Sequence, residues 1–403
     1  MKLKTIAGVL ASAGALVTAG AVAQISGDVV KIGFITDMSG LYSDIDGPNG
    51  AEAIRMAIAD MGGMVAGKKI ELLVADHQNK ADVAASKARE WFDTEGVDML
   101  IGGTNSGTAL AMAKVALEKK KPFIVVGPGS NRLTNEECTP YTIAYAYDTV
   151  ALAQVTGSQI VKNGGKSWYF LTADYAFGAS LEKDATEVIK ANGGTVVGSV
   201  RHPLAASDFS SFLLQAQASK AQILGLANAG GDTINSIKAA KEFGINKTMK
   251  VAGLLVFIND VHSLGLPTAQ GLLVTDSWYW DKDEASRAWS KRFFDKAKKE
   301  PSSLQAADYS AATFYLNAVK AVNSDDADKV MAQMRKTKIN DFYAKDGYIR
   351  EDGRMIHEMY LLEVKSQSES KYPWDYYKLV AKVPGEQAFL SVAKSQCKLL
   401  KKS

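Results

Sequence analysis

The chain has 403 residues, of which 47% are hydrophobic and 23% are charged. This length suggests two domains of ordinary size, and the apolar fraction excludes wholesale disorder and collagen-like structure. The net charge of +3 is spread along the chain, so no nucleic-acid partner is expected. Two Cys and four scattered His do not supply the ligands of a zinc module, and we expect no metal site.

The first 23 residues have the pattern of a secretory signal peptide. Lys2 and Lys4 precede an apolar stretch from Ile6 to Val22, and Ala21-Val22-Ala23 forms an A-x-A cleavage site. A membrane anchor is the alternative, but the apolar run is short for a bilayer span and ends in small residues. We therefore expect cleavage after Ala23, export to the periplasm, and no membrane insertion of the mature chain.

Export to an oxidising compartment permits a disulfide, and Cys138 and Cys397 are the two cysteines of the chain. A bond between them would fasten the C-terminal tail to the first half of the chain. The alternative is a pair of unpaired, buried thiols, and the sequence leaves both possibilities open.

Short β-like runs alternate with helical stretches along the mature chain. In the first unit we expect strands at 30–35, 69–74, 99–101 and 123–126, and helices at 50–61, 82–95 and 106–119. In the second unit we expect helices at 149–163, 177–192, 209–218 and 232–243, and strands at 168–171, 195–200, 222–226 and 249–254. Residues 283–335 have a mostly helical pattern, and a further strand is expected at 359–364. This alternation predicts an α/β fold with two doubly wound, parallel-sheet lobes.

Four of the predicted strand-to-helix loops are rich in glycine and small polar residues, at 102–107, 127–131, 174–178 and 228–232. In open parallel sheets, ligands bind beyond the C-terminal ends of the strands. A ligand clamped between the two units would therefore contact loops of both. Ser106 begins a predicted helix, where a hydroxyl and neighbouring N–H groups suit a carboxylate. The alternative is that all four loops are ordinary turns and helix caps.

Sequence motifs for catalysis are missing. Residues 102–107 have the glycine spacing of a P-loop but no following Lys, and there is no G-x-S-x-G, H-E-x-x-H or C-x-x-C motif. Asp76 and His77, at a predicted strand end, are the pair on which an exported hydrolase would depend. We therefore expect a binding protein without a cofactor rather than an enzyme.

Several segments resemble one family of transport proteins. They are the run from Ile32 to Gly40, the helix start at Gly50-Ala51-Glu52, and residues 67–72, 172–178, 208–210 and 269–272. Together they are similar to the solute-binding protein of a branched-chain-amino-acid-type (Leu/Ile/Val-binding-protein-like) ABC transporter. The resemblance covers essentially the whole mature chain. It implies the type I periplasmic binding protein fold, in which two lobes joined by three hinge crossings close over a ligand.

The resemblance places the crossings near residues 147–149, 274–277 and 352–358. One lobe would then comprise residues 24–147 and 277–355, and the other residues 148–276 and 356–384. Residues 385–403 would form a C-terminal tail that returns to the first lobe. Hinge closure would present the liganded protein, expected to be a monomer, to the membrane permease of the ABC transporter.

The family's ligand site can be carried over position by position. On the side that holds the ligand carboxylate, the resemblance implies Asn105, Ser106, Gly127, Gly129 and Ser130. On the side that faces the rest of the ligand, it implies Asp148, Phe177, Asn228, Ala229 and Leu255. Tyr42, Tyr147 and Phe257 are expected to complete an apolar wall with Phe177 and Leu255.

Leu255 stands where amino-acid binders of this family carry the acid for the ligand ammonium group. A desolvated ammonium without a counter-charge is strongly disfavoured, and Phe177 removes a phenol acceptor as well. We therefore predict a carboxylic acid with an apolar, preferably aromatic, body, and a hydrogen bond from a ligand hydroxyl to Asp148. The alternatives are an aliphatic amino acid held through Asp148 alone, an exported hydrolase, and a sensor that signals its closed state to a receptor.

Overall fold

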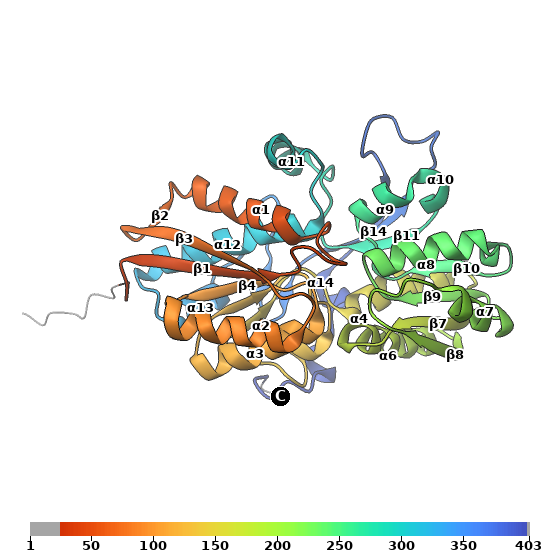
Figure 1. The fold of residues 1–403 in the computed structure, drawn as a ribbon, viewed down its shortest axis with the longest axis horizontal. Coiled ribbons are helices and arrows are strands. Elements are labelled where there is room, and N and C mark those ends of the chain that lie inside the picture. The colour runs from red at the N-terminus through yellow and green to blue at the C-terminus, as the bar shows by residue number, and fades with distance from the viewer. Residues whose placement is uncertain (1–24, 401–403) are drawn as a thin grey trace, which may run out of the picture.

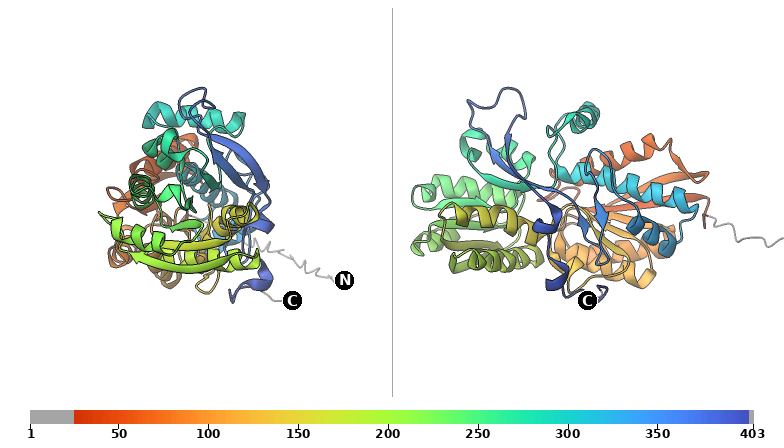
Figure 2. Two further views of the ribbon diagram at one scale, coloured as in Figure 1. Left: turned by 90° about the vertical axis from the view of Figure 1, so that its right-hand side faces the viewer. Right: turned by 180° about the vertical axis from the view of Figure 1, so that it is seen from behind.

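The computed structural model describes residues 25–400, so the predicted signal peptide and its cleavage site lie outside the described residues. Two α/β lobes lie side by side, and a small third sheet lies where they join (Figure 1). The views in Figure 2 show the C-terminal segment running back to the first lobe. Within residues 25–400, no helix has both the length and the apolar character needed to cross a membrane.

The first lobe is built on a six-stranded sheet with the order β2-β3-β1-β4-β5-β6. Its strands are β1 (Val29–Thr36), β2 (Met64–Val65), β3 (Lys68–Asp76), β4 (Met99–Gly102), β5 (Phe123–Val125) and β6 (Thr142–Ala144). All pairs are parallel except β2 with β3. The crossover helices are α1 (Gly47–Asp60), α2 (Ala81–Glu90) and α3 (Ser106–Lys119). The central strand β1 is buried without interruption from Ile32 to Thr36, as expected for a parallel strand covered on both faces.

The second lobe contains a four-stranded parallel sheet with the order β10-β9-β7-β8. Its strands are β7 (Ser167–Ala173), β8 (Thr195–His202), β9 (Ile223–Ala227) and β10 (Lys250–Gly253). Its helices are α4 (Thr149–Leu152), α5 (Ser158–Lys162), α6 (Ala176–Ala191), α7 (Ser210–Ala218), α8 (Gly231–Glu242), α9 (Ile258–Leu264) and α10 (Leu266–Ala269). The predicted helices at 82–95 and 149–163 each contain a π-helical turn, at Trp91–Glu95 and Ala153–Gly157.

The last part of the chain adds elements to both lobes. The third sheet is antiparallel, in the order β11-β14-β15, and consists of β11 (Leu273–Asp276), β14 (Met359–Val364) and β15 (Tyr377–Val383). The remaining elements are α11 (Glu284–Ala297), α12 (Ser303–Val322), α13 (Ala327–Lys336), β12 (Tyr348–Ile349), β13 (Met355–Ile356) and α14 (Gly385–Ala388). Helix α12 packs along α1 and so returns the chain to the first lobe.

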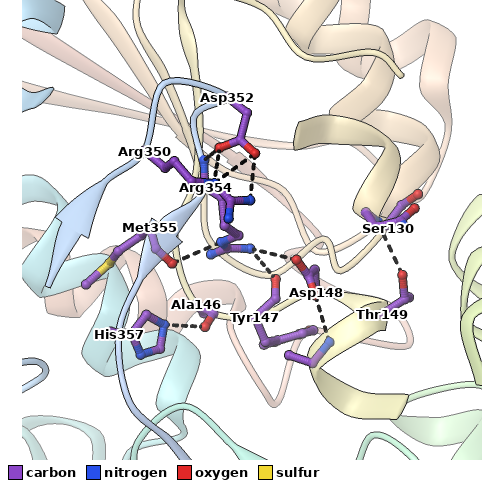
Figure 3. A network of polar contacts seen from close by, with 12 residues as sticks. Ser130, Ala146, Tyr147, Asp148, Thr149, Arg350, Asp352, Arg354, Met355 and His357 are labelled. Atoms are coloured by element: carbon purple, nitrogen blue, oxygen red, sulfur yellow. Dashed lines mark hydrogen bonds and ion pairs between the residues drawn. The ribbon is translucent and has the colours of Figure 1, made fainter. Parts of the chain in front are cut away.

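A buried arginine connects the predicted first crossing to the predicted third (Figure 3). The Arg354 side chain donates to the carbonyl oxygens of Tyr147 (2.9 Å) and Met355 (3.1 Å), and its Nη1 lies 3.8 Å from the Asp148 carboxylate. His357, also on the third crossing, places Nε2 2.8 Å from the carbonyl oxygen of Ala146. The two segments between the lobes therefore share a hydrogen-bonded contact.

The C-terminal tail is attached to the first lobe covalently. Cys138 and Cys397 form a disulfide with their Cα atoms 5.7 Å apart, which is the first of the two possibilities that the sequence left open. Next to it, the N–H of Gln396 donates to Asn135 Oδ1 at 2.5 Å. The tail is thus held by a covalent bond and by polar contacts to the turn that carries Asn135.

Candidate functional site

In each lobe, the topology of the sheet creates a crevice beyond the C-terminal end of a central strand. Strand β1 lies between β3 and β4, and strand β7 lies between β8 and β9. Chain connections leave these central strands in opposite directions, so the loops beyond their C-terminal ends are separated by a gap. The loops after β1, β4, β7 and β9 carry Tyr42, Thr104, Tyr175 and Ala229, which all line one cavity.

This cavity contains about 240 Å³ of empty space, part of which is open to solvent. It is lined by Tyr42, Ile45, Thr104, Gly127, Gly129, Tyr147, Tyr175, Phe177, Ala229, Leu255 and Leu304. No acidic or basic side chain occurs among these described lining residues. The walls are therefore aromatic and aliphatic, with hydroxyl groups and backbone amides as their polar elements.

The loop after β1 owes its shape to one buried carboxylate. Asp37 accepts hydrogen bonds from the N–H groups of Gly40 (2.6 Å) and Tyr42 (2.9 Å) and from Asn79 Nδ2 (2.6 Å). These bonds satisfy backbone donors that the turn would otherwise leave unpaired. The result is that Tyr42, which is 1% exposed, faces the second lobe.

The structure does not bring the three predicted polar side chains of the carboxylate side to the cavity wall. Asn105 Oδ1 caps α3 by accepting from the N–H groups of Gly107 (2.8 Å) and Thr108 (3.2 Å). Ser106 Oγ accepts from the N–H of Ser130 at 3.1 Å. The Ser130 hydroxyl lies 2.7 Å from that of Ser180. These side chains hold the loops and the two lobes in place instead of lining the cavity.

Other polar groups face the ligand position on this side. Within residues 25–400, the backbone N–H groups of Thr104, Gly127 and Gly129 make no hydrogen bond, and the Thr104 hydroxyl has one weak contact, 3.5 Å from that of Thr36. Gly129 must be glycine, because a Cβ atom there would lie 2.8 Å from the Tyr147 ring and 2.9 Å from the Phe177 ring. Three N–H groups and one hydroxyl of these lining residues are therefore without a strong hydrogen-bond partner among the described residues.

Asp148, predicted to contact the ligand, serves the hinge instead. Its Oδ1 accepts from the N–H of Ala151 at 2.8 Å and so caps α4, while its Oδ2 faces Arg354. Burial raises the pKa of Asp148, and the nearby Arg354 lowers it. Burial also lowers the pKa of Arg354, to about 10. Asp148 does not line the cavity, and no acid occurs among the described residues that do.

Of the remaining predicted ligand-binding residues, some line the cavity and others pack behind its wall. Leu255, predicted to contact the ligand, is 3% exposed and lines the cavity. Phe257 lies behind the wall, with its ring 6.1 Å from that of Tyr147. Asn228 is turned into the second lobe, where its side chain bonds Thr233 (2.8 Å) and Ser236 (3.1 Å). Seven of the thirteen predicted ligand-binding residues thus line the cavity: Tyr42, Gly127, Gly129, Tyr147, Phe177, Ala229 and Leu255.

Four lining residues were not predicted: Ile45, Thr104, Tyr175 and Leu304. Thr104 and Tyr175 belong to two of the glycine-rich loops, so the loops were identified but not the side chains that face the cavity. Ile45 and Leu304 lie in segments far apart in the chain, at the end of the loop after β1 and in the first turn of α12. No local sequence pattern predicts that Ile45 and Leu304 lie close together, because their proximity depends on tertiary packing.

Three phenols supply most of the hydroxyl groups of the cavity. Tyr147 Oη donates to the carbonyl oxygen of Gly127 at 2.5 Å, and the hydroxyls of Tyr42 and Tyr175 lie 2.6 Å apart across the two lobes. Burial raises the pKa of all three side chains well above the usual value of a tyrosine. The phenols are therefore neutral at physiological pH.

Asp76 and His77 form part of a turn. Asp76 Oδ1 accepts from the N–H of Gln78 at 2.7 Å, and His77 Nδ1 accepts from the N–H of Asn79 at 3.0 Å. Burial lowers the pKa of His77 to about 4, so its imidazole is neutral. Within residues 25–400, no cluster of His, Cys, Asp and Glu suits a metal ion.

Two α/β lobes with an apolar cavity between their strand-end loops define a periplasmic solute-binding protein. Residues 29–370 match the periplasmic binding protein family, and the chain belongs to that family. A crystal structure of a periplasmic binding protein from Burkholderia mallei is 70% identical and superimposes with a TM-score of 0.92 over 93% of this chain and all of that one.

Two further solved structures connect the family to ABC transporters. One is a branched chain amino acid ABC transporter periplasmic ligand-binding protein from Burkholderia xenovorans LB400, 40% identical with a TM-score of 0.81 over 92% of this chain and 99% of that one. The other is an ABC transporter solute-binding protein from Rhodopseudomonas palustris BisB5 in complex with 3,4-dihydroxybenzoic acid. It is 25% identical, with a TM-score of 0.80 over 89% of this chain and 98% of that one.

Proposed function

We propose that this protein captures a small monocarboxylic acid with an apolar body, one aromatic ring or a short carbon chain, and delivers it to an ABC permease. The observation that carries the proposal is the cavity wall, whose described residues include no acid that could balance a ligand ammonium group. Leu255 lines the wall where amino-acid binders are expected to carry that acid, and Asp148 is engaged by α4 and Arg354.

The carboxylate of the ligand would lie against the N–H groups of Thr104, Gly127 and Gly129. Charge-assisted hydrogen bonds of this kind are roughly twice as strong as those between neutral groups. The ring or chain would then contact Tyr147, Phe177 and Leu255, and its burial supplies the hydrophobic part of the affinity. The dihydroxybenzoate complex of the Rhodopseudomonas palustris protein shows that this fold accommodates an aromatic acid.

The test compares acids that differ only in an amino group. L-Leucine and 4-methylpentanoate have the same carbon skeleton, and so do L-phenylalanine and 3-phenylpropanoate. With benzoate as a further probe, isothermal titration calorimetry on the mature, disulfide-bonded protein should show binding of one or more of the amine-free acids. The matching amino acid should bind at least tenfold more weakly, because its ammonium has no counter-charge. Tighter binding of an amino acid than of its amine-free partner would refute the proposal.

A matched pair of glycine variants locates the binding event. Gly129→Ala adds a methyl group 2.8 Å from the Tyr147 ring and should abolish binding. Gly157→Ala makes the same chemical change where no atom lies within 4 Å of the added Cβ, and it should leave binding unchanged. Equal effects of the two substitutions would place the ligand elsewhere.

A further inference from the structure

A pair of phenols closes the cavity across the two lobes. Tyr42 comes from the loop after β1 and Tyr175 from the loop after β7, and their hydroxyl oxygens lie 2.6 Å apart. Both side chains line the cavity. The Tyr175 ring is 6.1 Å from that of Phe177, which continues the wall toward Gly129. The pair is therefore part of the ligand site as well as a contact between the lobes.

The hydrogen bond between these two phenols leaves one hydroxyl proton without an acceptor. Each phenol has one proton to donate, and a hydrogen bond between two phenols uses only one of the two protons. Among residues 25–400, neither hydroxyl has a second hydrogen-bond partner. One phenolic proton is thus left without a protein acceptor beside the cavity, and buried donors are normally paired.

The groups around the pair do not accept this proton. Asp232, at the start of α8, is close enough to raise the pKa of both tyrosines, but it forms no hydrogen bond with either. Its Oδ2 instead accepts from the N–H of Ala205 at 3.1 Å, and its buried Oδ1 has no hydrogen-bond partner among the described residues. Tyr147, the third phenol of the cavity, donates its own proton to Gly127. In this structure no described residue accepts the remaining proton, so it is available to an acceptor on the ligand or to solvent.

We propose that Tyr42 and Tyr175 determine ligand specificity by binding a second oxygen atom of the ligand. The preferred ligand is then an apolar monocarboxylate that also carries a ring hydroxyl or a ketone oxygen, placed away from the carboxylate. That oxygen accepts the spare phenolic proton, and a ligand hydroxyl can in addition donate to a phenol lone pair. This inference rests on the proposed function, because it assumes that the carboxylate lies against Thr104, Gly127 and Gly129.

The test uses acids with and without the second oxygen. Benzoate is compared with 3- and 4-hydroxybenzoate, and pentanoate with 4-oxopentanoate, by titration calorimetry. The wild-type protein should bind an oxygen-bearing acid about two- to tenfold more tightly than its partner, the range of one neutral hydrogen bond. In Tyr175→Phe and Tyr42→Phe this preference should fall to about onefold, because the spare phenolic proton is removed.

Tyr309→Phe is the matched control, because Tyr309 lies on α12 and its hydroxyl contacts Asp60, outside the cavity. It should keep the wild-type preference, and the melting temperature of each variant verifies folding. Equal wild-type affinities within every pair would overturn the inference and leave the proposed function standing. If Tyr42→Phe and Tyr175→Phe both keep the wild-type preference for the oxygen-bearing acids, the inference is likewise overturned and the proposed function stands. If none of the acids binds while leucine does, the proposed function itself fails, and this inference fails with it.

Discussion

Replacing Leu255 by Glu should convert this protein toward amino-acid binding. Leu255 is 3% exposed and lines the cavity, so a carboxylate there would face the body of the ligand. A charge-assisted hydrogen bond to the ligand ammonium contributes about 1.5–3 kcal/mol. The introduced carboxyl group repels an amine-free acid only weakly, because it is buried and is expected to be protonated when no ammonium group is bound next to it.

These terms give the size of the effect. A gain of about 1.5–3 kcal/mol corresponds to roughly a ten- to hundredfold change in the affinity ratio of leucine to 4-methylpentanoate. The substitution also removes a buried leucine and buries a polar group, which should cost about 2–5 kcal/mol of folding free energy. Proteins of this kind have roughly 5–15 kcal/mol available, so the variant should still fold.

The assay is titration calorimetry of both ligands with the wild type, Leu255→Glu and Leu255→Gln. The Gln variant has nearly the same shape and loses the same apolar contact, but it lacks the charge. Leucine binding to the Glu variant should also release a proton, which appears as a dependence of the heat on the ionisation enthalpy of the buffer. Equal ratios in the Glu and Gln variants, or a wild type that already prefers leucine, would refute the reasoning.

Three further predictions concern stability. Exchanging Cys138 and Cys397 for Ser should lower the free energy of unfolding by about 2–5 kcal/mol in urea, because the bond closes a loop with a sequence separation of 259; an unchanged midpoint would contradict this. Arg354→Met should cost about 3–5 kcal/mol, since it leaves the Asp148 carboxylate buried and unpaired. Arg292→Met, which breaks an exposed ion pair with Asp60, should cost less than about 1 kcal/mol. Equal losses of unfolding free energy in Arg354→Met and Arg292→Met would refute the argument that burial makes the first pair important. Burial raises the pKa of Asp276 to about 7, so the native state binds more protons than the unfolded state and stability falls as pH rises from 4 through 7. Asp276→Asn should therefore reduce the change in unfolding free energy between pH 5 and 8 by about 2–3 kcal/mol. If the free energy of the variant changes with pH as much as that of the wild type, Asp276 is not the source of the pH dependence.

Much of the architecture could be predicted because hydrophobic periodicity is local. The helix expected at 106–119 and the strand expected at 359–364 have those bounds in the structure. The strand Tyr377–Val383 was missed, since it forms by pairing with β14 rather than through a strong pattern of its own, and Leu379 and Val380 are exposed. The π-helical turns were missed as well, because one inserted residue per turn hardly changes the periodicity.

The candidate site could be predicted to the level of loops but not of atoms. Glycine-rich strand ends identify where a ligand lies in an α/β sheet, and this reasoning identified Gly127 and Gly129. Which hydroxyl of a loop faces the ligand depends on backbone dihedrals within the turn. Ser106 and Ser130 were predicted from the family resemblance, and Ser106 also from its place at a helix start. In the structure, Ser106 instead accepts a hydrogen bond from the backbone N–H of Ser130. Thr104, two residues earlier, lines the cavity instead.

The contacts that join the lobes across the cavity bear on how a ligand controls closure. The hydroxyl pairs Tyr42–Tyr175 and Ser130–Ser180 span 2.6 and 2.7 Å, and Asn259 Nδ2 donates to the carbonyl oxygen of Asp44 at 3.1 Å. These three join uncharged groups, and each contributes only about 0.5–1.5 kcal/mol net, because water replaces them when the lobes separate. Asn131 Nδ2 also donates to the Asp184 carboxylate at 3.2 Å. A ligand of micromolar affinity contributes about 8 kcal/mol, more than these contacts combined. Closure should therefore be driven mainly by the ligand, since only an acid that contacts both lobes has a large difference in affinity between the closed and open forms.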